Sequence, residues 1–244
     1  MKGVIGFFDI LGYQNFLENN SEIVYAERIV ELILGTPEDV IKAVQDYNFN
    51  PIINEITKDI KHIVFSDTIV IVIEYGNEPE ELKRSLAYQT MILTASELTA
   101  KMFLLGLPTR GVLHEGEFLI KGFCLAGKAV VESYKLCEKL NYSGLVCTKV
   151  LQEKLEPILT TPMYDSFLFK YLTPLKNGEE QLLNCNWINF FIDPIENIDD
   201  FVFTAFSAHN KDCSISVDTK ILNTSKSIRK MQHLKKLRVQ HLEK

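Results

Sequence analysis

The sequence predicts an α+β fold, in which helices pack on an antiparallel sheet. Short apolar runs rich in β-branched residues, typical of buried strands, recur at 3–8, 60–75 and 109–119. Segments with the apolar spacing of helices separate these runs along the chain. Glycine and proline punctuate the boundaries, and we find no internal repeat or low-complexity tract.

The first half of the chain predicts a strand at 3–8, helices at 21–34 and 38–47, a hairpin at 60–75, a helix at 79–105 and a strand at 109–119. Gly35, Thr36 and Pro37 are expected to end the first helix, and Pro37 suits the first turn of the second. Asp67 should lie in or beside the hairpin turn. Residues 69–73 are apolar without exception, so both faces of that strand should be covered.

The second half predicts a loop at 122–127, a helix at 129–140, a strand at 144–148, a short helix at 150–155, a strand pair at 167–172 and 182–189 with its turn at Asn177-Gly178, and a helical tail. The order of the core is β-α-β-β-α-β, a ferredoxin-like plan with helices on one face of the sheet. The C-terminal strand pair and helix follow that core. We expect one domain over 1–214 and a helical extension, 215–244, packed on that domain or on a dimer partner.

Composition excludes several classes of protein. The 244-residue chain has a net charge of −6, which argues against a nucleic-acid surface. Its 5 cysteines form no C-x-x-C pair, as expected of reduced thiols in the cytosol, and its 5 histidines show no zinc-binding spacing. Asp9 interrupts the first apolar stretch too early for a signal peptide, and no run approaches the roughly 20 residues that span a bilayer. We therefore expect a cytoplasmic protein without a membrane span.

Asp9 and Asp67 are the strongest candidates for a functional site. Each stands where an apolar strand breaks, and the predicted topology makes the two strands neighbours. Two such carboxylates, with the Ile10 carbonyl as a third oxygen ligand, can hold two hard divalent cations. Gly12 allows a close turn, and free backbone N–H groups at 12–15 favour phosphate oxygens. The ordinary alternative is that Asp67 is a turn residue and Asp9 a helix cap.

Four segments, in order, resemble the class III nucleotidyl cyclases. Residues 8–13, Phe-Asp-Ile-Leu-Gly-Tyr, resemble the family's F-x-D-I-x-G-F, and 66–69, Ser-Asp-Thr-Ile, its G-D segment; these carry the two metal aspartates. Residues 110–116, Arg-Gly-Val-Leu-His-Glu-Gly, are similar to R-I-G-I-H-x-G, and 124–131, Cys-Leu-Ala-Gly-Lys-Ala-Val-Val, to C-L-x-G-x-x-V-N. The match spans residues 4 to 148. In detail, including Asn-Cys-Asn-Trp at 184–187, the chain looks closest to the bacterial pyrimidine (uridylate and cytidylate) cyclases of Pycsar antiphage systems.

The resemblance implies a class III cyclase core and a definite reaction. A nucleoside triphosphate would be converted into a 3′,5′-cyclic monophosphate, cUMP or cCMP, and pyrophosphate, with two divalent cations, Mg²⁺ or Mn²⁺, at Asp9, Ile10 and Asp67. It also implies a homodimer with composite active sites and a separate effector protein that reads the cyclic nucleotide in antiphage defence. The residues that would contact the nucleotide are Ile10, Leu11, Gly12, Tyr13 and Cys124.

Two departures from the family pattern leave alternatives open. The family's transition-state Asn aligns with Val131 and its Arg with Lys135. Lys135 can neutralise phosphate charge as the catalytic cation, although it lacks the bidentate fork of arginine. An alignment shifted by one residue would bring in Glu132 or Tyr134. The chain is therefore an active cyclase, or a weak or inactive nucleotide-binding module; a palm-like nucleotidyltransferase is a third hypothesis, which the acidic charge disfavours.

The base of the substrate is suggested by two positions. Ile63 stands where purine-specific relatives place Lys or Glu, and an apolar group cannot read a purine edge, which favours UTP or CTP. Cys124 stands where guanylate cyclases carry a cysteine, although a small buried thiol is its more ordinary role. His114 and Glu115 are strand neighbours that should point to opposite faces, so we do not expect an acid–base pair.

Overall fold

The computed structural model describes residues 1–20, 22–46, 56, 58, 60–77, 81–122 and 124–242. Its strands are β1 (Lys2–Ile10), β2 (Ile60–Phe65), β3 (Thr68–Glu74), β4 (Thr109–Glu117), β5 (Leu119–Lys121), β6 (Cys124–Ala126), β7 (Gly144–Cys147), β8 (Leu168–Leu175) and β9 (Gly178–Cys185). Its α-helices are α1 (Tyr13–Asn19), α2 (Ile23–Asp46), α4 (Glu81–Leu104), α5 (Lys128–Lys139), α6 (Lys149–Leu155), α7 (Pro162–Phe167), α8 (Ile198–Ser207) and α9 (Ile215–Leu242). Short 3₁₀ helices are η1 (Glu156–Ile158), η2 (Trp187–Phe190) and η3 (Ala208–Asn210).

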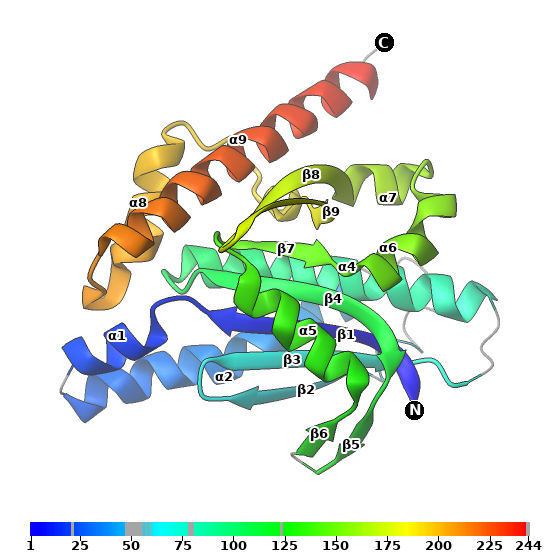
Figure 1. The fold of residues 1–244 in the computed structure, drawn as a ribbon, viewed down its shortest axis with the longest axis horizontal. Coiled ribbons are helices and arrows are strands. Elements are labelled where there is room, and N and C mark those ends of the chain that lie inside the picture. The colour runs from blue at the N-terminus through cyan, green and yellow to red at the C-terminus, as the bar shows by residue number, and fades with distance from the viewer. Residues whose placement is uncertain are drawn as a thin grey trace.

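The main sheet is 7-stranded, in the order β2-β3-β1-β4-β7-β9-β8 (Figure 1). The order of its first four strands confirms the predicted ferredoxin-like core. Neighbouring strands are antiparallel except β4 and β7, which are parallel. Because β1 lies between β3 and β4, Asp9 is opposite Thr68 on one side and Arg110 on the other. The C-terminal end of β1 therefore meets both the central hairpin and the start of β4.

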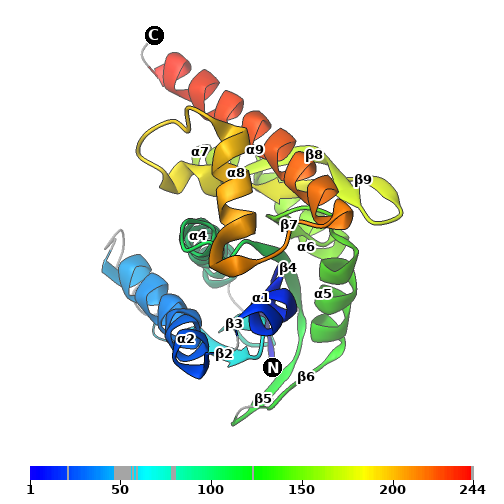
Figure 2. The same cartoon turned by 90° about the vertical axis from the view of Figure 1, so that its left-hand side faces the viewer.

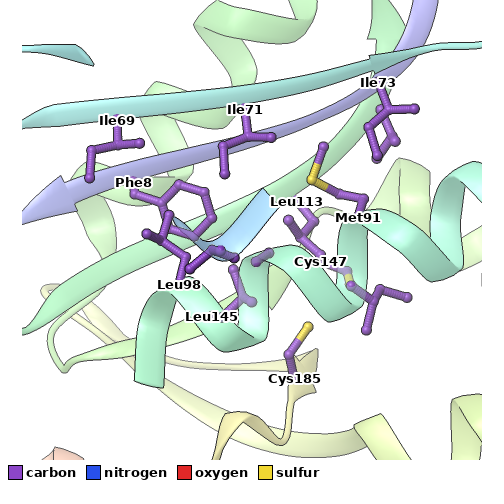
Figure 3. Close-up of a cluster of buried hydrophobic side chains, with 14 of the residues drawn as sticks. Phe8, Ile69, Ile71, Ile73, Met91, Leu98, Leu113, Leu145, Cys147 and Cys185 are labelled. Carbon is purple, nitrogen blue, oxygen red and sulfur yellow. The ribbon is translucent and has the colours of Figure 1, made fainter. Parts of the chain in front are cut away.

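Helices cover both faces of the sheet, whereas all were expected on one face. On one face the side chains of β1 and β3 pack against Met91 and Leu98 of α4 (Figure 3), and α2 contacts α4 and β2. On the other face α5 packs against β1 and β4 through Ala129 and Cys137 (Figure 2). The physical reason is that strands such as β3, which is buried throughout 69–73, carry apolar side chains on both faces. Each face of the sheet therefore has to be covered by helices.

Residues 23–46 form one helix, so the prediction of a break at Gly35-Thr36-Pro37 is wrong. Pro37 is buried inside α2, and the Thr36 hydroxyl donates a hydrogen bond to the Leu32 carbonyl at 2.6 Å. An interior proline removes one helical hydrogen bond. An uninterrupted apolar stripe nevertheless keeps both halves of α2 on the core, and this packing outweighs the local cost; it consists of Ile29, Ile33, Val40, Ile41 and Val44. The end residues of the predicted helices, 21 and 47, lie outside the described residues.

Other predicted elements hold, with two corrections. The turn between β2 and β3 contains Asp67, and the helix predicted at 79–105 is α4, with 79 and 80 outside the described residues. The predicted loop at 122–127 is wrong in part, because β5 and β6 form a separate two-stranded hairpin there. The strand predicted at 182–189 is β9, which ends at Cys185 and not at 189, because η2 follows it and buries Trp187.

The C-terminal part ends in the long helix α9, which contacts α8 and η2 beyond the far end of the sheet (Figure 1). Nothing in the sequence pattern predicted α8, which lies in the 190–214 interval. The division into a domain at 1–214 and an extension at 215–244 stays a prediction. None of the described helices has both the length and the apolar character that a membrane crossing requires.

Candidate active site

Asp9 and Asp67 lie beside each other at the C-terminal end of β1. Asp9 is the next-to-last residue of that strand, and Asp67 lies in the turn between β2 and β3. The Ile10 amide donates a hydrogen bond to the Asp67 carbonyl at 2.9 Å, which fixes the turn to the strand end. Ser66 adopts a left-handed conformation, with φ 55°, that reverses the chain at this point. Burial is the main cause of the raised pKa of the Asp9 carboxyl, and the negative charge of Asp67 raises it further, so the two side chains interact electrostatically.

Arg110 contacts Asp9, and sequence reasoning did not include it among the candidate site residues. Burial is the largest influence on Asp9 and raises its pKa, whereas the charge of Arg110 and its hydrogen bond act in the opposite direction. Arg110 Nε donates to Asp9 Oδ2 at 2.7 Å, and the two side chains are only 13% and 22% exposed. The positive charge of Lys176, between β8 and β9, also lowers the pKa of Asp9. The pairing of Arg110 opposite Asp9 in the β1–β4 register is the signal that could have identified it.

The donor chemistry of this pair fits divalent cations. Asp9 and Asp67 offer hard oxygen ligands, and a bound cation would relieve the repulsion between them, which adds to burial in raising the pKa of Asp9. Within the described ranges, no three His, Cys, Asp or Glu side chains gather as a metal-binding group. A cation held by two carboxylates would therefore complete its ligands with backbone oxygen such as the Ile10 carbonyl, substrate phosphates and water.

The predicted nucleotide-contacting residues 10–13 follow Asp9 into α1. Ile10 and Leu11 are buried, and the Leu11 amide donates to the Pro108 carbonyl at 2.8 Å, so it is not available to a phosphate. Gly12 is exposed, with φ 78°, directly before α1. Burial and the negative charge of Asp67 raise the pKa of Tyr13, which places its ring near that carboxylate. The structure thus brings Tyr13 toward Asp67 and leaves Gly12 accessible beside it.

Lys135 and Cys124 are exposed and lie on elements other than those that carry Asp9 and Asp67. Lys135 projects from α5, and the charges that shift the pKa of Asp9 do not include it. Val131 and Tyr134, on the same helix, are 48% and 47% exposed. Cys124 is exposed on β6, so the expectation of a small buried thiol is wrong: the β5–β6 hairpin is separate from the main sheet.

His114 and Glu115 point to opposite faces of β4, as predicted. His114 Nδ1 lies 2.7 Å from Thr148 Oγ1, and its Nε2 lies 3.2 Å from a carboxylate oxygen of Glu132 on α5. Burial lowers the pKa of His114. Glu115 faces the other side, where it accepts a hydrogen bond from the Tyr75 hydroxyl. The two side chains are therefore structural and do not form an acid–base pair.

No protein-family model and no curated protein matches the chain. Among solved structures, the monomeric guanylyl cyclase domain of the RhoGC fusion protein from the aquatic fungus Blastocladiella emersonii has a TM-score of 0.50 at 11% identity, covering 75% of this chain and 95% of that chain. A double mutant of that domain has a TM-score of 0.50 at 9% identity, covering 75% and 93%. The guanylate cyclase domain of RhGC from Catenaria anguillulae, solved with GTP, has a TM-score of 0.49 at 11% identity, covering 75% and 95%.

At these identities the likeness shows the fold alone. The chain has the mixed α+β fold of class III cyclase catalytic domains, with a mostly antiparallel sheet and helices packed on it. A shared fold leaves activity to be argued from the site itself.

Proposed function

We propose that this chain is a metal-dependent nucleotidyl cyclase, which converts a nucleoside triphosphate into its 3′,5′-cyclic monophosphate and pyrophosphate. The observation that carries the proposal is the pair Asp9 and Asp67, which lie beside each other at the end of β1 in a chain with a cyclase fold. The four sequence segments that resemble the class III cyclases support the same activity.

In the proposed reaction the ribose 3′-oxygen forms a bond to the α-phosphorus. The bond between that phosphorus and the oxygen bridging to the β-phosphorus breaks, pyrophosphate leaves, and the 3′-proton passes to solvent. Mg²⁺ or Mn²⁺ bound by Asp9, Asp67 and the Ile10 carbonyl would lower the pKa of the 3′-hydroxyl and neutralise triphosphate charge. Arg110 lowers the pKa of Asp9 against the effect of burial and fixes the orientation of its carboxylate. We propose that Gly12 and Tyr13, at the start of α1, contact the nucleotide.

We propose UTP or CTP as the substrate. Ile63 lies on β2, four residues before Asp67, and is only partly buried. Its side chain has no hydrogen-bonding group with which to recognise a purine edge. The exposed thiol of Cys124 makes GTP the purine to test beside the pyrimidines.

We also propose a homodimer with composite active sites. Lys135 is exposed on α5 and is not among the groups that shift the pKa of Asp9 in its own protomer, so it would serve catalysis by reaching the site of a second copy. The sequence likeness to the Pycsar cyclases supports a further role, in which the cyclic nucleotide is a second messenger for a separate effector protein in antiphage defence.

One specific observation favours a second candidate function. Val131 and Lys135 stand where the family carries its transition-state Asn and Arg, and valine cannot orient a ribose by hydrogen bonding. A chain of this kind could bind a nucleotide as a regulatory module without turnover.

The proposal is tested by incubating the purified protein with Mg²⁺ or Mn²⁺ and each of ATP, GTP, CTP and UTP, with products identified by mass spectrometry. We expect cUMP or cCMP from the wild-type chain, none from Asp67→Ala, and undiminished product from Asp39→Ala, which alters an exposed aspartate on α2. Nucleotide binding without product would favour the regulatory module. A product from GTP alone would overturn the pyrimidine assignment, and linear oligomers would overturn cyclisation.

A further inference from the structure

The segment that joins α8 to α9, residues 208–212, contacts the turn that follows Asp9. The methylene stem of Lys211 lies against Gly12, where an added Cβ would come within 3.0 Å of Lys211 Cδ. The ammonium group of this buried lysine donates to the Gly106 carbonyl at 2.7 Å and to the Ala205 carbonyl at 3.3 Å. One side chain therefore connects the β1–α1 turn, the α4–β4 turn and the end of α8.

Asp212 fixes α1 to the same segment. Its Oδ2 accepts hydrogen bonds from the side-chain amides of Asn15 at 3.2 Å and Asn19 at 3.0 Å. Its backbone amide donates to Asn15 Oδ1 at 2.5 Å, and the Asn19 side chain also donates to the Asn210 carbonyl at 2.8 Å. The contacts thus extend along α1, from its first turn to its end.

The backbone of the segment is held in an uncommon conformation. His209 and Asn210 both have positive φ, 62° and 58°, which is rare for residues other than glycine. The Asn20 side chain donates to the His209 carbonyl at 2.9 Å, and Asn210 Nδ2 donates to Asn20 Oδ1 at 2.9 Å. His209 Nε2 lies 2.7 Å from the Leu105 carbonyl oxygen. Strained residues of this kind persist where surrounding contacts over-determine them, and they gather at functional sites.

A role in packing alone does not account for a lysine at position 211. Lys211 is buried, and it forms no ion pair with any of the described residues. Burial lowers its pKa to about 8, which reports the cost of keeping the ammonium there. An apolar side chain would fill the same space without this cost. What the ammonium adds is directional bonding to two carbonyl groups.

We propose that residues 208–212 hold the β1–α1 turn in the conformation that presents Asp9 and Ile10 to substrate, with Lys211 and Asp212 as positioning residues. This inference rests on the proposed cyclase function. Its physical basis is that α1 has only 7 residues, too few for a helix to be stable by itself, so its position depends on tertiary contacts. The C-terminal helices thereby help to set the geometry of a site at the other end of the chain.

Hydrogen exchange tests the positioning role without reference to activity. The reporters are the amides of Leu11 and Phe16, which donate to Pro108 and Gly12. We expect exchange at both to accelerate at least about tenfold in Lys211→Met and Asp212→Ala, through local opening. The matched control is Lys235→Met, which removes another ammonium-to-carbonyl bond, to Phe191 at 2.5 Å, on the distal half of α9. Unchanged exchange at Leu11 and Phe16 in both variants would overturn the proposal.

Binding provides the second readout. We expect Lys211→Met and Asp212→Ala to weaken Mn²⁺ binding in the presence of a non-hydrolysable nucleotide about tenfold, with Lys235→Met unaffected. Because Asp212 is exposed, its replacement keeps the test available if Lys211→Met fails to fold. If the wild-type chain neither binds nor converts nucleotides, the proposed function is wrong. The hydrogen-exchange result still decides the positioning role in that case. If the wild type is active and exchange at Leu11 and Phe16 is unaltered in both variants, the positioning role alone is defeated.

Discussion

Arg110 donates a hydrogen bond from Nε to Oδ2 of Asp9 over 2.7 Å. A second nitrogen of the same guanidinium donates to the Glu138 carbonyl at 3.1 Å, near the end of α5. One side chain on β4 therefore links the candidate metal carboxylate on β1 to the helix that carries Lys135. The charge state of Asp9 is consequently tied to the position of Arg110.

We expect Arg110→Met to shift the acid limb of the pH–activity profile to higher pH. Burial raises the pKa of Asp9 and Arg110 lowers it, so removing the guanidinium lets that pKa rise further. At a given acidic pH more Asp9 is then protonated, and a protonated carboxyl binds cations poorly. We expect an activity loss on the order of tenfold at mildly acidic pH, larger than the loss at pH 8.

The control for this shift is Arg229→Met, which breaks an ion pair with Asp199 at 2.5 Å between exposed side chains of α9 and α8. Its profile should follow that of the wild type, because exposed pairs contribute little. An acid limb that stays in place in Arg110→Met would contradict the assigned role of Asp9.

Complementation tests the composite homodimer. Asp67→Ala and Lys135→Ala chains should each be inactive alone, yet a mixture should regain activity. In a random 1:1 mixture half of the dimers are heterodimers with one intact site, so recovery should approach about a quarter of wild-type activity. Product formation is measured after co-refolding or co-expression. Absence of any recovery, with mixed dimers shown to form, would place Lys135 outside the partner's site.

Tyr142→Phe should destabilise the fold without altering the site. The buried Tyr142 hydroxyl donates to Asn184 Oδ1 at 2.5 Å, and Asn184 Nδ2 donates to Thr173 Oγ1 at 2.8 Å. Removing the hydroxyl leaves a buried amide oxygen without this donor, at a cost of about 1–3 kcal/mol in the free energy of unfolding. Urea denaturation measures this loss. Tyr171→Phe, at a partly buried ring, is the control and should cost less; an equal loss in both would refute the role given to the buried network.

Local sequence was sufficient to predict that Asp9 and Asp67 lie close together, because each interrupts an apolar strand and the element order makes those strands neighbours; their role as metal ligands stays a prediction. It was not sufficient for Arg110, whose partner depends on the register of β1 against β4, and a one-residue slip would turn its side chain to the other face. The helix end predicted at Pro37 is wrong because the packing of a continuous apolar stripe overrides a local helix-breaking signal. The expectation of a buried thiol at Cys124 is wrong because this residue lies on a hairpin separate from the main sheet.

The 208–212 segment shows a further limit of local patterns. Asn15 and Asp212 are hydrogen bonded although they are 197 residues apart in sequence. Polar residues in such segments have the composition of ordinary loops, so no periodicity marks them as partners of α1. Only the folded chain brings them to the turn after Asp9.

Mn²⁺ binding in the presence of a non-hydrolysable UTP or CTP analogue tests the central claim most directly. The loss of the free-ion electron paramagnetic resonance signal would be followed for the wild type, Asp9→Asn, Asp67→Asn and the surface control Asp39→Asn. The account predicts about two bound cations per wild-type chain and per control chain, with affinity at least about tenfold lower in each site variant. Equal Mn²⁺ binding by the wild type and both site variants would contradict it.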